Sequence, residues 1–130
     1  MKNKNRIFIV DDIPDNLHLL KQILQDDYKL SFATSGKNAI KAIEIILPDL
    51  ILLDIMMPKM DGFEVCRKLK SKEKTREIPI IFLTANVTEE SEIKGFELGA
   101  ADYITKPISA SIVKARVKNL LDLRNAQKKN

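Results

Sequence analysis

Five short apolar runs alternate along the chain with longer segments in which apolar residues recur every three or four positions. The runs cover residues 6–10, 29–33, 50–53, 79–83 and 102–105. The first, third and fourth consist almost entirely of Ile, Leu, Val and Phe, which is typical of strands covered on both faces. The pattern therefore predicts five strands, with at least the central ones buried between two layers.

The segments between the runs have the spacing of amphipathic helices. Pro14 suits a first helical turn, Gly62 follows Asp61 at a helix start, and Thr88 and Ser109 are candidate N-caps of the last two helices. Glu89 and Glu90 then lie in a first turn, where the helix dipole favours negative charge. The apolar positions are Leu17, Leu20 and Leu24 in the first helix, and Ile40, Ile43 and Leu47 in the second. They are Phe63, Val65, Cys66 and Leu69 in the third helix, and Ile112, Val113, Val117, Leu120 and Leu121 in the last.

Strand–helix alternation repeated five times predicts an α/β fold, a doubly wound five-stranded parallel sheet with five helices on its two faces. In such sheets, ligands bind beyond the carboxyl ends of the strands, where the strand order reverses. The side chains at those ends are therefore the candidates for function.

Charge and composition exclude several classes of protein. The net charge is +4, but residues 106–130 carry +6 and the rest of the chain −2. A second basic stretch, 67–76, has no interleaved aromatic residues, so we expect solvated helix ends and no nucleic-acid binding through this domain. No apolar run is long enough to cross a membrane, and the single cysteine, Cys66, excludes an internal disulfide. We therefore expect a cytoplasmic domain, with Cys66 as a small core residue.

Three carboxylates stand at strand ends. Asp11 and Asp12 follow the first strand, and Asp54 follows the third. Taken alone, these residues have ordinary explanations. Asp11 and Asp12 could provide the N-cap of the helix that begins near Pro14, and Asp54 could be a turn residue. If the two strands are neighbours, however, the like charges crowd into one cleft unless a cation joins them. Mg²⁺, or Mn²⁺, is the natural cation for such an oxygen-rich site.

A hydroxyl and an ammonium group end the remaining strands. Thr84 follows the fourth strand and Lys106 the fifth. Together with a metal and a carboxylate, these groups suit the stabilisation of a phosphoryl group carried on that carboxylate. A plain salt bridge is the simpler interpretation of Lys106, and both can hold for the same residue.

These residues lie in four segments that resemble the receiver domain of two-component response regulators, the CheY-like family. The segments read VDD at 10–12, LDIMMPKMDG at 53–62, LTA at 83–85 and GAADYITKP at 99–107. The resemblance extends to about Leu121 and implies a flavodoxin-like sheet of strand order 2-1-3-4-5. It also implies that Asp54 takes a phosphoryl group from a sensor histidine kinase, a histidine phosphotransfer protein or a small donor such as acetyl phosphate.

The resemblance implies a role for each matched residue. Asp12, Asp54 and the backbone carbonyl of Met56 would bind Mg²⁺ directly, and Asp11 would act largely through water. Lys106 would contact a phosphoryl oxygen, and its bond to Pro107 is expected to be cis. On activation Thr84 would swing toward the phosphoryl group and Tyr103 would turn inward, altering the face formed by the fourth helix, fifth strand and fifth helix.

The sequence departs from the family pattern at a few positions. Ala101 stands where many relatives have an acid, and Ile108 stands where Phe is common, so the geometry of a homodimer formed on phosphorylation cannot be carried over. Met56 and Asn86 occupy positions that in receiver domains tune how fast water removes the phosphoryl group. Because Met56 offers no hydrogen bond to an attacking water, we expect slow hydrolysis.

Other functions remain as alternatives at this point. A Mg²⁺-dependent phosphatase with an aspartyl-phosphate intermediate would carry its nucleophile after the first strand, in an Asp-x-Asp pattern that residues 11–15 do not supply. A flavin mononucleotide binder would need a Ser, Thr or Gly loop where Asp11 and Asp12 stand. A basic nucleic-acid-binding module is supported only by the pI of 9.2. His18, on the first helix, lacks a partner at metal-ligand spacing and is expected at the surface.

The end of the receiver domain is expected near Leu121, and the residues after it are considered separately. We expect a receiver domain over 1–121, not itself an enzyme with an external substrate. Residues 122–130 are expected to be a basic helical extension, either the frayed end of a stand-alone receiver or, as we slightly favour, a linker toward a possible output domain after residue 130.

Overall fold

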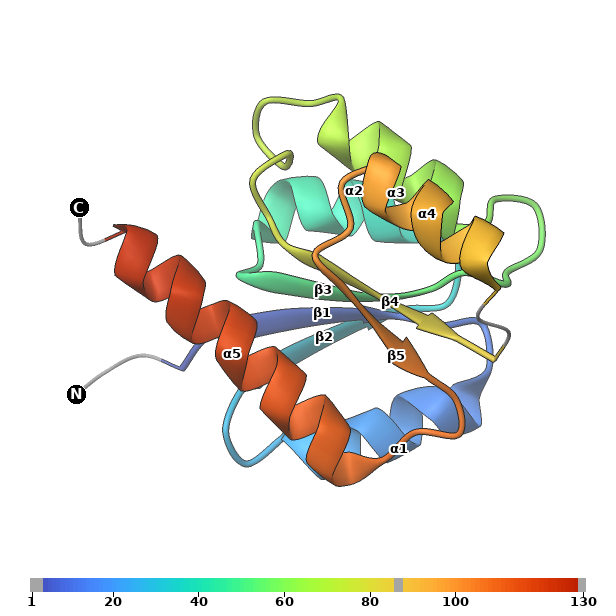
Figure 1. The fold of residues 1–130 in the computed structure, drawn as a ribbon. Helices are drawn as coiled ribbons and strands as arrows, with labels where there is room; N and C mark the ends of the chain where they lie inside the picture. Colours follow the sequence, from blue (N-terminus) through green and yellow to red (C-terminus); the bar gives the residue numbers. More distant parts are fainter. Residues whose placement is uncertain (1–3, 86–87, 129–130) are drawn as a thin grey trace.

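The structure is a computed structural model that describes residues 4–85 and 88–128. Five strands and five helices alternate along the chain (Figure 1). They are β1 (Arg6–Val10), α1 (Pro14–Leu24), β2 (Lys29–Ala33), α2 (Gly36–Ile46), β3 (Leu50–Asp54), α3 (Gly62–Lys70), β4 (Ile80–Thr84), α4 (Glu89–Glu97), β5 (Asp102–Thr105) and α5 (Ala110–Lys128). The predicted α/β fold with five strands and five helices is confirmed.

The strands form one parallel sheet in the order β2-β1-β3-β4-β5. Figure 1 shows α2, α3 and α4 on one face of the sheet and α1 and α5 on the other. The order implied by the family resemblance is thereby confirmed. It reverses between β1 and β3, so the site predicted from Asp11, Asp12 and Asp54 lies at this reversal.

The core has one layer on each face of the sheet because successive strand residues point to opposite faces. Phe8, Val10, Ile51, Leu53 and Phe82 pack with α2 and α3, and Ile7, Ile9, Leu50, Leu52 and Leu83 pack with α1 and α5. The residues of β3 and β4 are all buried, as the continuous apolar runs predicted. Cys66 is fully buried, as predicted, and burial raises the pKa of its thiol to about 11.

Two details of the helices differ from the sequence pattern. Leu47 is not part of the apolar face of α2, because it ends the helix in the left-handed conformation (φ 52°) and is 46% exposed. Pro48 follows and cannot continue the helical hydrogen bonds. Ile112, at the start of α5, is also 46% exposed. Thr88, by contrast, caps α4 as predicted, and its hydroxyl accepts a hydrogen bond from the N–H of Ser91 (3.1 Å).

Helix α5 passes residue 121 without interruption and returns to the amino-terminal edge of the sheet. There the guanidinium of Arg124 donates to the carbonyls of Asp49 (3.2 Å) and Glu77 (3.4 Å). The amide of Asn125 lies 3.5 Å from the side-chain oxygen of Asn5. Residues beyond 121 therefore contact the domain. Within the described part of the chain, no helix combines the length and the apolar character needed to span a membrane.

Candidate functional site

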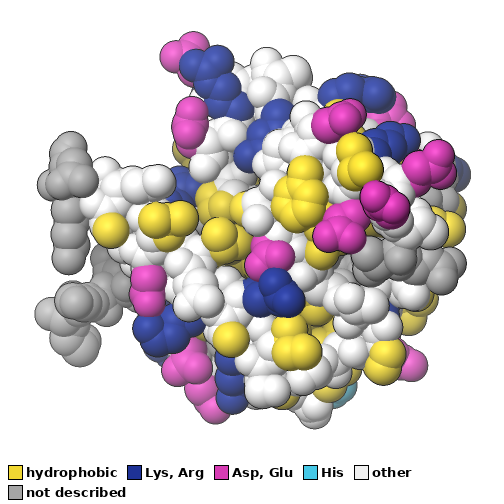
Figure 2. Space-filling model, viewed as in Figure 1, with side chains coloured by type: hydrophobic (Ala, Val, Ile, Leu, Met, Phe, Trp, Pro, Cys, Tyr) yellow, Lys and Arg dark blue, Asp and Glu magenta, His cyan; other side chains and the backbone are white. Residues whose placement is uncertain are grey.

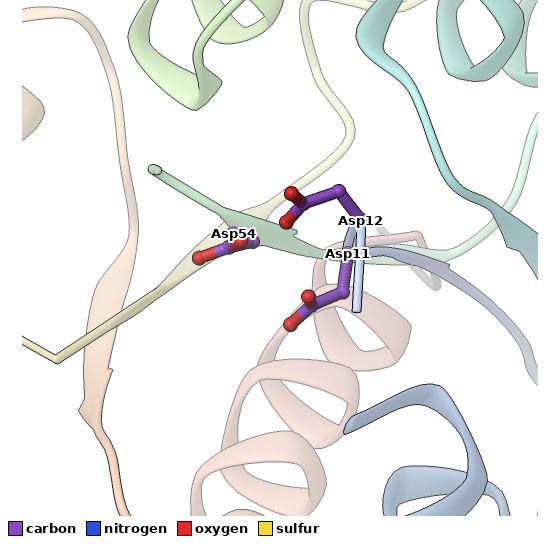
Figure 3. Close-up of side chains that lie close together, drawn as sticks. All are labelled: Asp11, Asp12 and Asp54. Carbon is purple, nitrogen blue, oxygen red and sulfur yellow. The ribbon is translucent and has the colours of Figure 1, made fainter. Parts of the chain in front are cut away.

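The parallel sheet brings the three predicted carboxylates together at one edge. Val10 of β1 lies beside Leu53 of β3, so the residues that follow them meet. One carboxylate oxygen of each of Asp11, Asp12 and Asp54 lies within 4.8 Å of the others. Figure 3 shows the three side chains together at the ends of their strands. Asp11 is 0% exposed and Asp54 2%, and Asp12 is partly buried. The predicted crowding of like charges is therefore present.

Lys106 is the counter-charge of this cluster. Its ammonium group donates to Oδ2 of Asp11 and to Oδ1 of Asp54, each at 3.2 Å. The backbone N–H of Lys106 donates to the carbonyl of Thr84 (2.8 Å), which holds the end of β5 against the end of β4. The Lys106–Pro107 peptide bond is cis, as the resemblance implied. The predicted salt bridge and the predicted proximity to Asp54 both hold.

Asp11 has a donor at each carboxylate oxygen. The N–H of Ile13 donates to Oδ1 (3.0 Å), and the side-chain amide of Asn16 lies 3.3 Å from Oδ1 and 3.1 Å from Oδ2. With Lys106 on Oδ2, both oxygens are engaged. Asn16 was not identified from the sequence, since an Asn in a first helical turn carries no distinctive spacing signal. Asp11 is thus held as a fixed charge beside the other two carboxylates.

Asp12 differs from Asp11 in having an open oxygen. Its Oδ1 atom is buried and has no hydrogen-bond partner among the described residues. A buried polar atom without a partner is costly unless another ligand satisfies it. Because a carboxylate oxygen of Asp12 also lies in one cluster with an oxygen of Asp54, the two residues fit a hard divalent cation such as Mg²⁺.

The protonation of Asp54 reflects its surroundings. Burial, and after it the negative charge of Asp11, raise the pKa of Asp54 to about 6, although Lys106 acts in the opposite direction. Burial alone would lower the pKa of Lys106, but the carboxylates of Asp11 and Asp54 raise it overall. Lys106 therefore stays charged, while Asp54 is a carboxylate that a cation would help to ionise.

The loop after β3 is held close to Asp54 by a glycine. The N–H of Gly62 donates to the carbonyl of Ile55 (2.9 Å), and Asp61 caps α3 by accepting from the N–H of Glu64 (2.9 Å). A Cβ atom at Gly62 would lie 2.8 Å from the Cα of Ile55 and closer still to the carbonyl oxygen of Asp54. A side chain at position 62 would therefore displace Asp54. The side chain of Met56, in the same loop, is 69% exposed.

The two predicted switch residues lie on β4 and β5. Thr84 is the last residue of β4 and is 2% exposed. Tyr103, in β5, is 7% exposed, and its hydroxyl donates to the carbonyl of Ser91 in α4 (2.6 Å). The structure thus holds Tyr103 in the inward position. Asn86, also named from the sequence, lies outside the described residues, and His18 is exposed as predicted.

Comparisons with known proteins agree with this geometry. Residues 7–118 match the model of the family described as "Response regulator receiver domain". The chain is 47% identical over 116 residues to the response regulator PleD of Caulobacter vibrioides, a match that covers 88% of this chain and 26% of PleD. It is also 47% identical over 111 residues to a probable cyclic di-GMP phosphodiesterase of Vibrio cholerae, covering 85% of this chain and 25% of that protein. The chain thus spans about a quarter of the length of these relatives.

One solved structure with the same fold is described with a bound metal ion. It is the receiver domain of the sensor histidine kinase PA1611 of Pseudomonas aeruginosa, described with a magnesium ion coordinated in its active-site cleft. The TM-score is 0.84 at 27% identity, and the match covers 92% of this chain and 98% of that one.

Proposed function

Because the chain belongs to the response regulator receiver domain family, we propose that Asp54 is its phospho-acceptor. A carboxylate oxygen of Asp54 attacks the phosphorus of a phosphohistidine, forming an acyl phosphate as the bond from phosphorus to the imidazole nitrogen breaks. The observation that carries this proposal is the position of Asp54. It is a buried carboxylate 3.2 Å from the ammonium group of Lys106 and in one cluster with Asp11 and Asp12.

Asp12 and Asp54 are the proposed ligands of Mg²⁺, or Mn²⁺, and the backbone carbonyl of Met56 is proposed as a third. The open Oδ1 of Asp12 supports this assignment. Because both oxygens of Asp11 already accept hydrogen bonds, Asp11 acts through water as a second-sphere charge. When bound, the metal neutralises negative charge on the carboxylates and on the phosphoryl oxygens.

Lys106 and Thr84 are the proposed partners of the phosphoryl group. Lys106 exchanges its contact with Asp54 for one with a phosphoryl oxygen, and Thr84 donates a hydrogen bond from its hydroxyl. Such donors stabilise charge that develops during the transfer. The movement of Thr84 then acts on Tyr103, and the face of α4, β5 and α5 changes in response.

The proposed partner is a sensor histidine kinase or a histidine phosphotransfer protein, and phosphorylation is proposed to favour a homodimer. The signal is passed to an output unit. In the longer relatives, such a unit would lie outside the quarter of their sequence that matches this chain. We propose that this domain turns over no substrate other than its own aspartyl phosphate and that it does not bind nucleic acid. We also propose a cytoplasmic location.

The test is the intact mass of the protein after incubation with acetyl phosphate and Mg²⁺. We expect a gain of one phosphoryl group, lost in Asp54→Asn and in the presence of EDTA, and retained in Asp15→Asn, an exposed aspartate of α1. A gain that persists in Asp54→Asn would contradict the assignment. If acetyl phosphate gives no product, titration with beryllofluoride and Mg²⁺ tests the same site, and no binding there would contradict the proposed function.

We propose that the phosphoryl group is lost slowly from Asp54. The reason is that the exposed side chain of Met56 offers no hydrogen bond to an attacking water. The decay of the phosphorylated mass after removal of acetyl phosphate measures it. A half-life of seconds would contradict the proposal.

A further inference from the structure

We infer that Gly95 in α4 is the residue that permits the inward position of Tyr103 and so sets the balance between its inward and outward positions. Gly95 is the one buried residue among those described in α4. It faces the aromatic side chains of Phe82 and Tyr103, from β4 and β5. The first part of the inference concerns geometry alone, and its consequence for signalling rests on the proposed function.

The hydroxyl of Tyr103 lies directly against the backbone of α4. It donates to the carbonyl of Ser91 (2.6 Å), with the carbonyl of Glu92 at 3.3 Å. In a regular helix the carbonyl of Ser91 also accepts from the N–H of Gly95, four residues on. The phenol therefore reaches the helix at the level of Gly95, where no side chain intervenes.

A side chain at position 95 is incompatible with this contact. A Cβ atom there would lie 2.7 Å from Cζ of Tyr103, closer still to its hydroxyl, and 3.1 Å from Cε2 of Phe82. Non-bonded carbon atoms are most stable about 3.5–4.0 Å apart, and a Cβ atom essentially never lies within 3.0 Å of such an atom. One of these groups would have to move if position 95 carried even a methyl group.

Tyr103 is the group that can move. Phe82 is 0% exposed in the central part of the core, where it also contacts Phe63 (ring centroids 5.3 Å apart). Tyr103, at 7% exposure, packs against Phe96, which is itself 47% exposed at the surface. A rotation about χ1 of Tyr103 would take its ring out of the contact with α4 without moving the backbone, at the cost of its contact with Phe82 (ring centroids 5.6 Å apart).

Helix stability alone would favour a different residue at this position. Glycine in a helix interior is less favourable than alanine, because it loses more conformational freedom on folding. Figure 2 shows charged and apolar side chains at the surface over the α4 side of the face in view, and Gly95 is the buried residue among those described in α4. The close contact with Tyr103 accounts for a glycine at this buried position.

The consequence for signalling follows from the proposed role of Tyr103. If the inward position belongs to the phosphorylated form, Gly95 keeps that position accessible. Replacement by alanine would hold Tyr103 outward and weaken the response to a phosphoryl group.

The experiment uses Tyr103 as its own reporter. The chain has no Trp and two Tyr residues, so Tyr28→Phe leaves Tyr103 as the single fluorophore. In this background we expect Gly95→Ala to raise the iodide quenching constant of Tyr103 several-fold, toward that of free tyrosine. The matched control is Glu97→Ala, an exposed residue of α4, which should leave quenching unchanged. Unchanged quenching in Gly95→Ala would overturn the inference.

A double-mutant cycle covers the case in which Gly95→Ala is too unstable for the quenching measurement. We expect Gly95→Ala to lower the melting temperature when Tyr103 is present, and to leave it unchanged or raise it in the Tyr103→Ala background. An equal loss in both backgrounds would overturn the inference, because the clash would then not involve Tyr103.

Titration with beryllofluoride and Mg²⁺ tests the functional part. We expect weaker binding to Gly95→Ala than to Glu97→Ala, and equal binding would refute the coupling. If the unaltered protein binds no beryllofluoride, the proposed function fails, while the quenching result still decides the role of Gly95.

Discussion

Helices α3 and α4 lie on the same face of the sheet and have nine residues each, but they are held differently (Figure 1). Helix α3 buries Gly62, Val65, Cys66 and Leu69. Helix α4 buries Gly95 alone among its described residues. Elements with few buried apolar contacts open at lower free energy than the rest of a domain. The difference therefore separates a fixed helix from one that can change position.

The two buried glycines show the same contrast at atomic detail. Gly62 faces the backbone of Asp54 and Ile55, which has no alternative position without disturbing β3. Gly95 faces the side chain of Tyr103, which has other rotamers. Helix α3 is thus fixed to the strand that carries the proposed acceptor, and α4 is positioned through a side chain that can turn.

The largest expected effect is on the stability of the α3 side. Leu69→Ala removes a fully buried side chain and should lower the free energy of unfolding by about 3 kcal/mol, as other buried leucines do. Ile93→Ala on α4, where the side chain is 51% exposed, should change it by less than about 0.5 kcal/mol. Urea unfolding of both variants measures the difference. Equal losses would mean that α4 is held as firmly as α3.

Gly62→Ala should have the next largest effect. The added Cβ meets backbone atoms of Asp54 and Ile55, so we expect a loss of about 1–3 kcal/mol, as for other overpacked positions. Because Asp54 would shift, binding of Mg²⁺ should weaken as well, which isothermal calorimetry can follow. Arg67→Ala, at an exposed position of α3, is the control and should leave Mg²⁺ binding intact. Normal Mg²⁺ binding by a folded Gly62→Ala protein would contradict the role of Gly62.

The charge of Asp54 adds a pH dependence at the α3 side. The folded protein raises the pKa of Asp54 from 3.8 to about 6, so between these values it binds more protons than the unfolded chain. Stability of the metal-free protein should therefore fall as the pH rises from about 4 to about 6. Asp54→Asn removes this penalty and should stabilise the protein above pH 6 by on the order of 1–2 kcal/mol, part being offset by the lost contact with Lys106.

Thermal unfolding in EDTA at pH 4 and pH 7 measures the effect of Asp54→Asn. The gain in melting temperature should be present at pH 7 and nearly absent at pH 4. The control Asp15→Asn should show no such pH-dependent gain. A gain of the same size at both pH values would refute the electrostatic origin.

The smallest effect concerns the direct link between the two helices. The ammonium group of Lys94 in α4 lies 4.7 Å from the centre of the Phe63 ring in α3. Such a cation–π contact at an exposed site contributes about 0.5–1 kcal/mol. A double-mutant cycle of Lys94→Met and Phe63→Leu should give a coupling energy of this size in urea unfolding. A coupling near zero would leave Tyr103 as the main attachment of α4.

The sequence predicted the fold closely because each element has an unambiguous local pattern. The bounds 6–10, 29–33 and 102–105 match the strands of the structure, since polar residues or turns flank them. The parallel sheet placed the ends of the first and third strands at one edge, but the strand order that makes these strands neighbours, and so brings Asp11, Asp12 and Asp54 together, came from the family resemblance. Their roles, and those of Thr84 and Met56, came from the family resemblance and remain proposals.

What the sequence did not reveal depends on side-chain contacts between distant elements. Asn16 and Gly95 have no distinctive spacing, and a glycine inside a helical pattern reads only as a weaker helix. The contact of Tyr103 with Ser91 joins β5 to α4 across a helical turn, and no periodicity encodes it. Leu47 was misplaced because its apolar character fits the helical repeat although Pro48 ends the helix.

The contact between Asn5 and Asn125 has a practical consequence. Asn5 directly precedes β1, at the amino-terminal edge of the sheet, whereas Asp54 ends β3 at the opposite edge. A reporter dye, an affinity tag or a sensor surface attached near residue 5 or residue 125 would therefore leave the acidic cluster uncovered. The distance between such a label and Asp54 also makes either position suitable for measuring partner binding without competing with it.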